Sequence, residues 1–130
     1  MPEYMLLICN PAEGLSPEEA QAEHPKWMAY SQALSDAGAF VSGNALQAVA
    51  TATTVRMRDD ERLVSDGPFA ETKEALAGYY IIEVADLDAA LDWAARIPSA
   101  TRGSVEVRPV QVFDAEPAAA AEQPASGAVA

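Results

Sequence analysis

The chain has 130 residues, half of them apolar, and its net charge at pH 7 is −12. This length suits one domain with a core that needs no disulfide. The acidic balance argues against nucleic-acid binding, which depends on Lys and Arg to neutralise phosphates. No apolar run is long enough to span a membrane and no secretory leader is visible, so we expect a cytoplasmic protein without a membrane partner.

The first predicted element is a strand over residues 4–9, which read YMLLIC. A continuous apolar run of this kind is typical of a central strand that is covered on both faces. Cys9, the only cysteine, ends the run, and we interpret it as a buried, inert thiol.

A helix is predicted to begin after Ser16, a good N-cap residue. Pro17 fits the first helical position, and Glu19 completes a capping box. The helix should end near Ala37, with Gly38 in the left-handed conformation.

Helical spacing gives this helix a predicted core face, which consists of Ala20, Trp27, Leu34 and Ala37. Pro25 removes a backbone hydrogen bond and restricts the residue before it, so we expect a kink or a short break after His24.

Further strands are predicted over residues 39–43, 52–58, 63–65, 78–84 and 104–113, with a turn at residues 59–60. Asp86 should cap a second helix that runs to about Ile97. The inward-facing residues predicted for that helix are Leu87, Leu91, Ala94 and Ile97.

This order predicts an α+β domain over residues 1–113. It matches the ferredoxin-like βαββαβ pattern, with two helices on one face of an antiparallel sheet and an extra hairpin arm. No third helix is available for the other face, and an apolar sheet face in water is costly, so we expect a homodimer. Residues 114–130 are rich in Ala, Pro and Glu and predict a disordered tail.

Residues 66–74 read DGPFAETKE. This run resembles the hallmark of the YCII-related family, in its DGPF branch, and the resemblance extends over residues 1–113. It implies a ferredoxin-like fold that forms a dimeric α/β barrel. It also implies a bacterial protein found beside extracytoplasmic-function sigma factors, which makes such a sigma factor a candidate partner.

Other members of that family carry a His on the first helix and an Asp just after the second, and this pair suggests an enzyme. In this chain the His position, counted back from Gly38, falls at Trp27. Residues 97–99 read IPS and contain no Asp. The resemblance therefore does not extend to the pair.

Two interpretations of the 66–74 segment stay open. In the functional one, Asp66 or Glu71 acts as acid or base in a cleft, and the segment supplies ligand contacts. Those candidate contacts are Gly67, Pro68, Phe69 and Lys73. In the structural one, Asp66 caps a turn, Phe69 fills the core and Lys73 is paired at the surface.

His24, the only histidine, is either a general base in need of an orienting partner or a solvent-facing residue at the helix kink. Tyr79, Arg56 and Arg108 lie on predicted strands and are candidate ligand contacts in a dimer cavity. One His and one Cys without ligand spacing predict no metal site. The chain also lacks a phosphate-binding loop, so we expect no cofactor.

Two functions fit these patterns, and a purely structural role is a third alternative. One is a ligand-binding or regulatory homodimer linked to a sigma-factor pathway. The other is a cofactor-free enzyme that acts on a small polar metabolite through Asp66, Glu71 or His24. The arrangement of the 66–73 loop and His24, around one cavity or on separate surfaces, discriminates between them.

Overall fold

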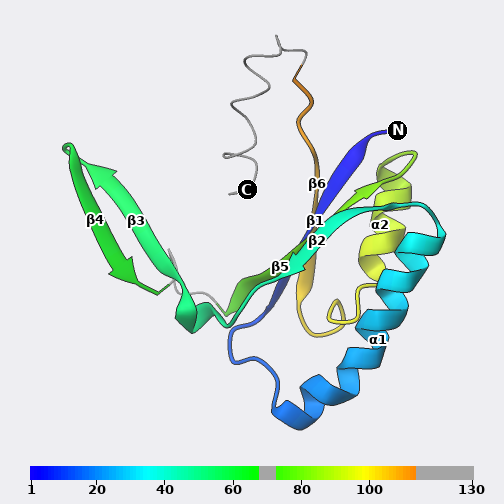
Figure 1. Ribbon diagram of the computed structural model, residues 1–130, viewed down its shortest axis with the longest axis horizontal. Coiled ribbons are helices and arrows are strands. Elements are labelled where there is room, and N and C mark those ends of the chain that lie inside the picture. Colours follow the sequence, from blue (N-terminus) through cyan, green and yellow to red (C-terminus); the bar gives the residue numbers. More distant parts are fainter. Residues whose placement is uncertain (68–72, 114–130) are drawn as a thin grey trace.

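The computed structural model describes residues 1–67 and 73–113. Its main sheet is antiparallel and has the strand order β2-β5-β1-β6. The strands are β1 (Glu3–Pro11), β2 (Phe40–Ala45), β5 (Glu74–Glu83) and β6 (Ser104–Pro109). Two helices, α1 (Pro17–Asp36) and α2 (Leu87–Ala95), lie on one side of this sheet (Figure 1). The arrangement is α+β and compatible with the expected ferredoxin-like fold. The predicted tail, residues 114–130, lies outside the described residues.

β1 is central, as predicted, but only one of its faces is covered. Tyr4, Leu6 and Ile8 are buried against the helices, whereas the alternate residues Met5 and Leu7 are only half-buried. The expected cover on both faces is wrong for the described chain, because α1 and α2 contribute to a single core on the same side.

α1 begins and ends as its capping residues predict. Ser16 Oγ accepts a hydrogen bond from the Glu19 amide at 3.2 Å, and the Glu19 carboxylate accepts one from the Ser16 amide at 3.0 Å. Gly38 has a φ of 69° and ends the helix. The helix is continuous through Pro25, so the expected break is absent, and its axis changes direction within its first half (Figure 1).

The two helices meet over the sheet through aromatic and small side chains. Tyr30 and Leu34 of α1 are buried together with Ala90 and Ala94 of α2. The Tyr30 hydroxyl donates to the Trp93 carbonyl oxygen at 2.8 Å. Burial raises the pKa of Tyr30 well above its usual value, so this hydroxyl keeps its proton and the link between the helices persists in alkaline solution.

Four of the predicted core positions are wrong. Ala20 and Ala37 of the first helix are exposed, and Leu87 and Leu91 of the second are about half-exposed. α2 turns its alanine face to the sheet, and small side chains let a helix approach closely, so its leucines point away from the core.

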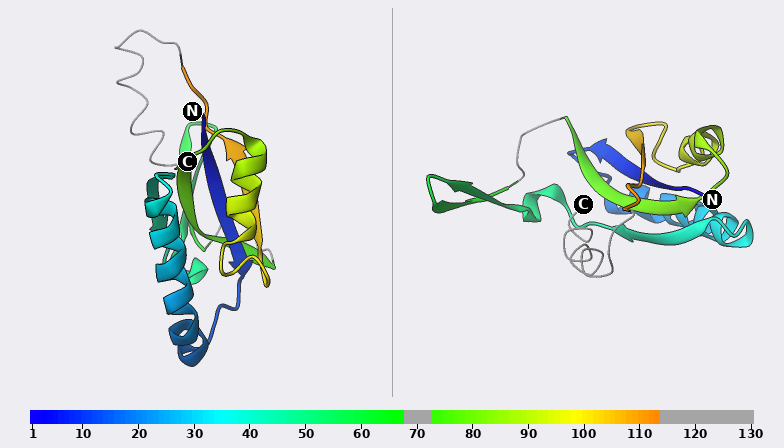
Figure 2. Two further views of the ribbon diagram at one scale, coloured as in Figure 1. Left: turned by 90° about the vertical axis from the view of Figure 1, so that its right-hand side faces the viewer. Right: turned by 90° about the horizontal axis from the view of Figure 1, so that it is seen from above.

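β3 (Thr53–Arg58) and β4 (Glu61–Asp66) form a separate two-stranded antiparallel sheet, which we call the hairpin arm. A short 3₁₀ turn, Val49–Thr51, leads into it. Asp59 and Asp60 both have positive φ, as a two-residue type I′ turn requires. The arm projects away from the helices (Figures 1 and 2). The predicted hairpin is therefore present, but its first strand belongs to the arm and not to the main sheet.

Substitution of Leu34 by Ala should cost about 2–5 kcal/mol of unfolding free energy, because it leaves a cavity in a fully buried part of the core. Met28→Ala on the same helix is the control, since Met28 is 60% exposed and should cost far less. Urea unfolding measures both changes, and equal losses would contradict the assignment of the core face.

Candidate functional site

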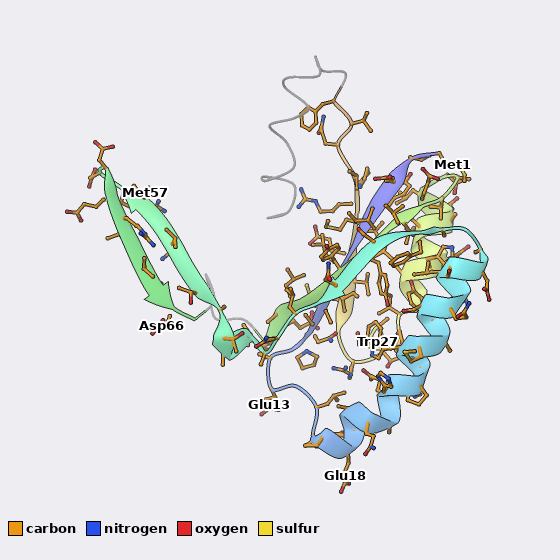
Figure 3. All side chains as sticks on the ribbon, viewed as in Figure 1. Met1, Glu13, Glu18, Trp27, Met57 and Asp66 are labelled. Carbon is orange, nitrogen blue, oxygen red and sulfur yellow. The ribbon has the colours of Figure 1, made fainter. Side chains whose placement is uncertain are left out.

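A cavity of about 670 Å³ lies between α1 and the sheet. Pockets of this size accommodate a small molecule. α1 contributes Ala20, His24, Trp27, Ser31 and Ser35, and the strands contribute Ile8, Phe40, Gly43, Tyr79 and Tyr80 among others. Figure 3 shows Trp27 between α1 and the strands.

Aromatic rings form a fixed wall of this cavity. The Tyr80 ring lies 5.4 Å from the Tyr30 ring and 6.2 Å from the Phe40 ring, centroid to centroid. Its hydroxyl is 2.8 Å from Ser31 Oγ. A Cβ at Gly43 would come within 2.8 Å of Tyr80 Cδ1, so glycine is needed there for the ring to lie against β2.

Glu23 holds Trp27 in position. One carboxylate oxygen, Glu23 Oε1, accepts from Trp27 Nε1 at 2.9 Å and from an Arg102 terminal nitrogen at 2.8 Å. Arg102 Nε donates to the other oxygen at 3.3 Å. The hydrogen bond from Arg102 lowers the pKa of Glu23. This network therefore fixes the indole and also ties α1 to the segment that follows α2.

The lining of the cavity is almost without charge. None of the lining residues in the described part of the chain is Asp, Glu, Lys or Arg, and His24 is the one imidazole among them. His24 makes no hydrogen bond to another described side chain. A paired acid and base, as the enzyme hypothesis requires, is not formed by these lining residues.

Asn10, another lining residue, carries an unmet hydrogen-bond acceptor. Its Oδ1 is buried and has no partner among the described residues. Buried polar atoms nearly always have a partner. This oxygen has almost no accessible surface, so a molecule in the cavity does not reach it, and its unmet bond is a local feature of the end of β1.

Two of the residues predicted from the sequence, His24 and Tyr79, line the cavity. Tyr79 pairs in register with Leu7, so its side chain lies on the sheet face opposite the helices, where its hydroxyl accepts from Asn44 Nδ2 at 2.9 Å.

The cavity does not include the described ends of the DGPFAETKE segment: Asp66 is exposed at the end of β4, and Lys73 precedes β5. Pro68, Phe69 and Glu71 lie outside the described residues, so their predicted roles stay predictions.

Gly67 has a structural role at the base of the hairpin arm. Its φ of 98° is a conformation that glycine favours. Its amide donates to the Ala52 carbonyl at 2.7 Å, and its own carbonyl accepts from Thr54 Oγ1 at 2.9 Å. These bonds agree with the interpretation that the start of the 66–74 segment forms a structural turn.

Arg56 and Arg108 do not line the cavity. Arg56 is on β3 in the hairpin arm. Arg108 is paired in register with Met5, on the sheet face opposite the helices, and lies 3.6 Å from Glu106 at an exposed position.

Cys9 is half-buried, not fully buried as expected. Burial raises the pKa of its thiol, and the Glu74 and Glu106 carboxylates raise it further. The thiol is therefore largely protonated, and so weakly nucleophilic, at neutral pH.

A model of the YCII-related domain matches residues 3–114. The chain belongs to the YCII-related domain family. It is also similar to an uncharacterized protein of Rhizobium meliloti (strain 1021), with 50% identity over 64 residues that cover 48% of this chain and 52% of the relative. The chain thus spans about half the length of that relative. The resemblance found in the sequence is confirmed at the level of the family, and the DGPF branch stays a prediction.

No helix within residues 1–67 and 73–113 combines the length and the apolar character needed to cross a membrane. In the same residues, no group of three or more His, Cys, Asp and Glu side chains is placed to hold a metal ion.

The Glu23 network was not predicted, because Glu23 and Arg102 are 79 residues apart and no local pattern joins them. The spacing of four residues between Glu23 and Trp27 is the one signal that the sequence contains, since such residues are neighbours on a helix surface.

Glu23→Gln should destabilise the fold by about 1–2 kcal/mol at pH 7, because the neutral amide loses the charge-assisted bonds to Arg102. The pKa of Glu23 is lowered from its ordinary value of 4.5. Its contribution is therefore present above about pH 4.5 and is lost as the pH falls through the folded-state pKa.

Denaturant unfolding between pH 3 and pH 7 measures this effect, with Glu18→Gln, an exposed position on the same helix, as the control. Wild type and Glu23→Gln should converge in stability at the acidic end. A constant difference across the range would contradict the assignment.

Proposed function

We propose that this YCII-related protein binds a small, uncharged and largely apolar molecule in the cavity between α1 and the sheet, and that it works as a homodimer. The observation that carries the proposal is the cavity of about 670 Å³, which has an aromatic wall and no ionic side chain other than a histidine among its described lining residues.

The chemical character of the lining selects the ligand class. A carboxylate or phosphate would lose its hydration without gaining a Lys or Arg partner, and an ammonium would find no Asp or Glu. A flat apolar ring can instead stack on or meet the edges of Trp27, Phe40 and Tyr80. Ser35 and His24 provide the few polar contacts that would orient it.

The uncovered side of the sheet supports the homodimer. Met5 pairs with Ile81 there and Leu7 pairs with Tyr79, and all four are half-buried within the single chain. A second copy that covers them would remove apolar surface from water, at roughly 25 cal/mol for each Å² buried. This supports the dimer and the α/β-barrel type of assembly as proposals.

We also propose a regulatory role for the protein. In this role its partner is an extracytoplasmic-function sigma factor, which responds to the bound ligand. The motif at residues 66–74 supports it through the resemblance to the DGPF branch. Co-expression of the two proteins, followed by affinity purification with and without ligand, tests it. Failure to co-purify in both states would remove the regulatory part and leave ligand binding intact.

The position of His24 favours a second candidate, the cofactor-free enzyme that acts on a small polar metabolite. His24 lines the cavity and could transfer a proton to or from a bound molecule. Asp66 does not line this cavity, so Glu71, the other carboxylate predicted from the sequence, would have to complete the site. A substrate screen with wild type and His24→Gln distinguishes the two candidates, because turnover that is lost in the variant supports the enzyme.

Ligand binding can be followed through Trp27 in a Trp93→Phe background, which leaves one tryptophan at the cavity. The probes are benzamide, benzoate and benzylamine, which share a ring and differ in charge. We expect saturable quenching or a spectral shift with the neutral amide and at least about tenfold weaker binding of the two ions, since each ion loses hydration.

Ala45→Trp, which fills the lining of the cavity, should abolish the benzamide response. Val41→Trp on the same strand is the control, because Val41 is exposed and does not line the cavity. Tighter binding of benzoate or benzylamine would overturn the ligand class. A response that persists unchanged in Ala45→Trp would overturn the site.

A further inference from the structure

The cavity between α1 and the sheet is elongated along the helix. The α1 residues that line it are Ala20, His24, Trp27, Ser31 and Ser35. They recur at spacings of three and four residues, so they form one stripe on the helix, which is about 22 Å long at about 1.5 Å of rise per residue. The cavity volume of about 670 Å³, spread over this length, gives a mean cross-section of about 30 Å². Carbon atoms in contact lie about 3.5–4.0 Å apart, so this section admits one chain or one ring at a time.

Aromatic rings bound the half of the cavity that lies toward the C-terminal end of α1. Residues 37–39 alone connect α1 to β2, which keeps the strand near the helix at this end. The rings of Phe40 and Tyr80 lie on the strand side, 6.2 Å apart between centroids. The Tyr80 hydroxyl reaches across to Ser31 Oγ at 2.8 Å. This half of the cavity therefore has room for a slender group.

Small residues line the opposite end of the cavity. α1 and β2 run in opposite directions and diverge toward the N-terminal end of the helix (Figure 1). Ala20 lines this end from the helix, and Ala45 and Gly78, which are partners in register, line it from the strands. None of these three side chains is larger than a methyl group, so this end has room for a ring. His24, one helical turn from Ala20, is the polar side chain beside it.

We propose that the cavity binds an elongated, uncharged molecule with an aromatic ring at one end and an unbranched apolar chain at the other, as in alkylated phenols and amides. The ring occupies the small-residue end beside His24, and the chain follows α1 past Ser31. Ser35, at the far end, is exposed, so a chain longer than the cavity can extend into solvent there. This rests on the ligand binding proposed above and adds the shape of the ligand.

The Tyr80 ring is fixed in place, so the chain has to fit beside it. A Cβ at Gly43 would come within 2.8 Å of Tyr80 Cδ1, which shows how closely the ring lies against β2. The hydrogen bond to Ser31 holds the hydroxyl end of the same ring. A branched group would have to displace the ring, which costs free energy in a packed site. An unbranched chain removes apolar surface from water without moving it.

Three neutral probes test the shape: benzamide, N-hexylbenzamide and its isomer N-(1,1-dimethylbutyl)benzamide. The two isomers have the same atoms and differ in the branching of the chain. Binding is followed through Trp27 in the Trp93→Phe protein. We expect N-hexylbenzamide to bind at least about tenfold more tightly than benzamide. The branched isomer should stay within about threefold of benzamide, because it meets the rings.

Each other outcome overturns a defined part of this picture. A branched isomer that binds as tightly as N-hexylbenzamide, or more tightly, would overturn the elongated shape, because apolar area alone would then decide affinity. If neither isomer binds more tightly than benzamide, the chain site is absent and the binding of small rings survives. No response to any of the three probes would overturn the ligand site itself.

Substitutions at Ser31 locate the chain. Ser31→Leu fills the slender half of the cavity and should remove the gain of N-hexylbenzamide over benzamide, while benzamide itself still binds. Ser31→Ala is the matched control, because it loses the same hydrogen bond to Tyr80 but adds no volume, and it should keep the gain. An undiminished gain in Ser31→Leu, or an equal loss in both variants, would contradict the placement of the chain.

Discussion

The one-sided covering of the main sheet governs the rest of the molecule. α1 and α2 pack on the same side, so the alternating residues of β1 have opposite environments: Leu6 is fully buried, and its neighbours Met5 and Leu7 are only half-buried. The helix side contains both the core and the cavity. The other side remains a half-buried apolar surface, with Glu3, Glu83, Glu106 and Arg108 around it. The cavity and the uncovered apolar surface thus lie on opposite sides of a single sheet.

The cavity exists because small and large residues are separated in space. Gly43, Ala45, Ala77 and Gly78 lie on the strands across from α1, where they leave room, while Trp27 and Tyr80 bound that room with rings. Each ring is held by a polar bond, the indole by Glu23 and the phenol by Ser31. The shape of the site is therefore set before any ligand arrives, which lowers the entropic cost of binding.

Local signals predicted the elements well. The capping box at Ser16 and Glu19, the glycine after α1 and the Asp86 cap of α2 all act within a few residues, so the sequence alone identifies them. The arm was likewise visible from its turn and its alternation. Which face of each helix is buried was less predictable. Leu87 and Leu91 have the spacing of core residues, but Ala90 and Ala94 are the buried residues of α2. The distance between the helix and the sheet decides which face fits against the sheet.

The candidate site was predictable only in part. His24 and Tyr79 were identified, and both line the cavity, although the Tyr79 side chain lies on the opposite face of the sheet. The DGPFAETKE run suggested further site residues, but Asp66 and Lys73 lie outside the cavity. Trp27 was assigned to the core and Glu23 was not assigned at all. Their role depends on Arg102 at the far end of the chain, and contacts between distant segments leave no periodic trace in a sequence.

The base of the arm has a consequence for how this protein can diverge. The Gly67 amide reaches the Ala52 carbonyl, so the two ends of the arm are already joined where they leave the body. A segment with joined ends can be lengthened, shortened or exchanged at small entropic cost to the remaining chain. Related proteins can therefore differ in the length or sequence of the arm, residues 53–66, while the body of the domain stays unchanged.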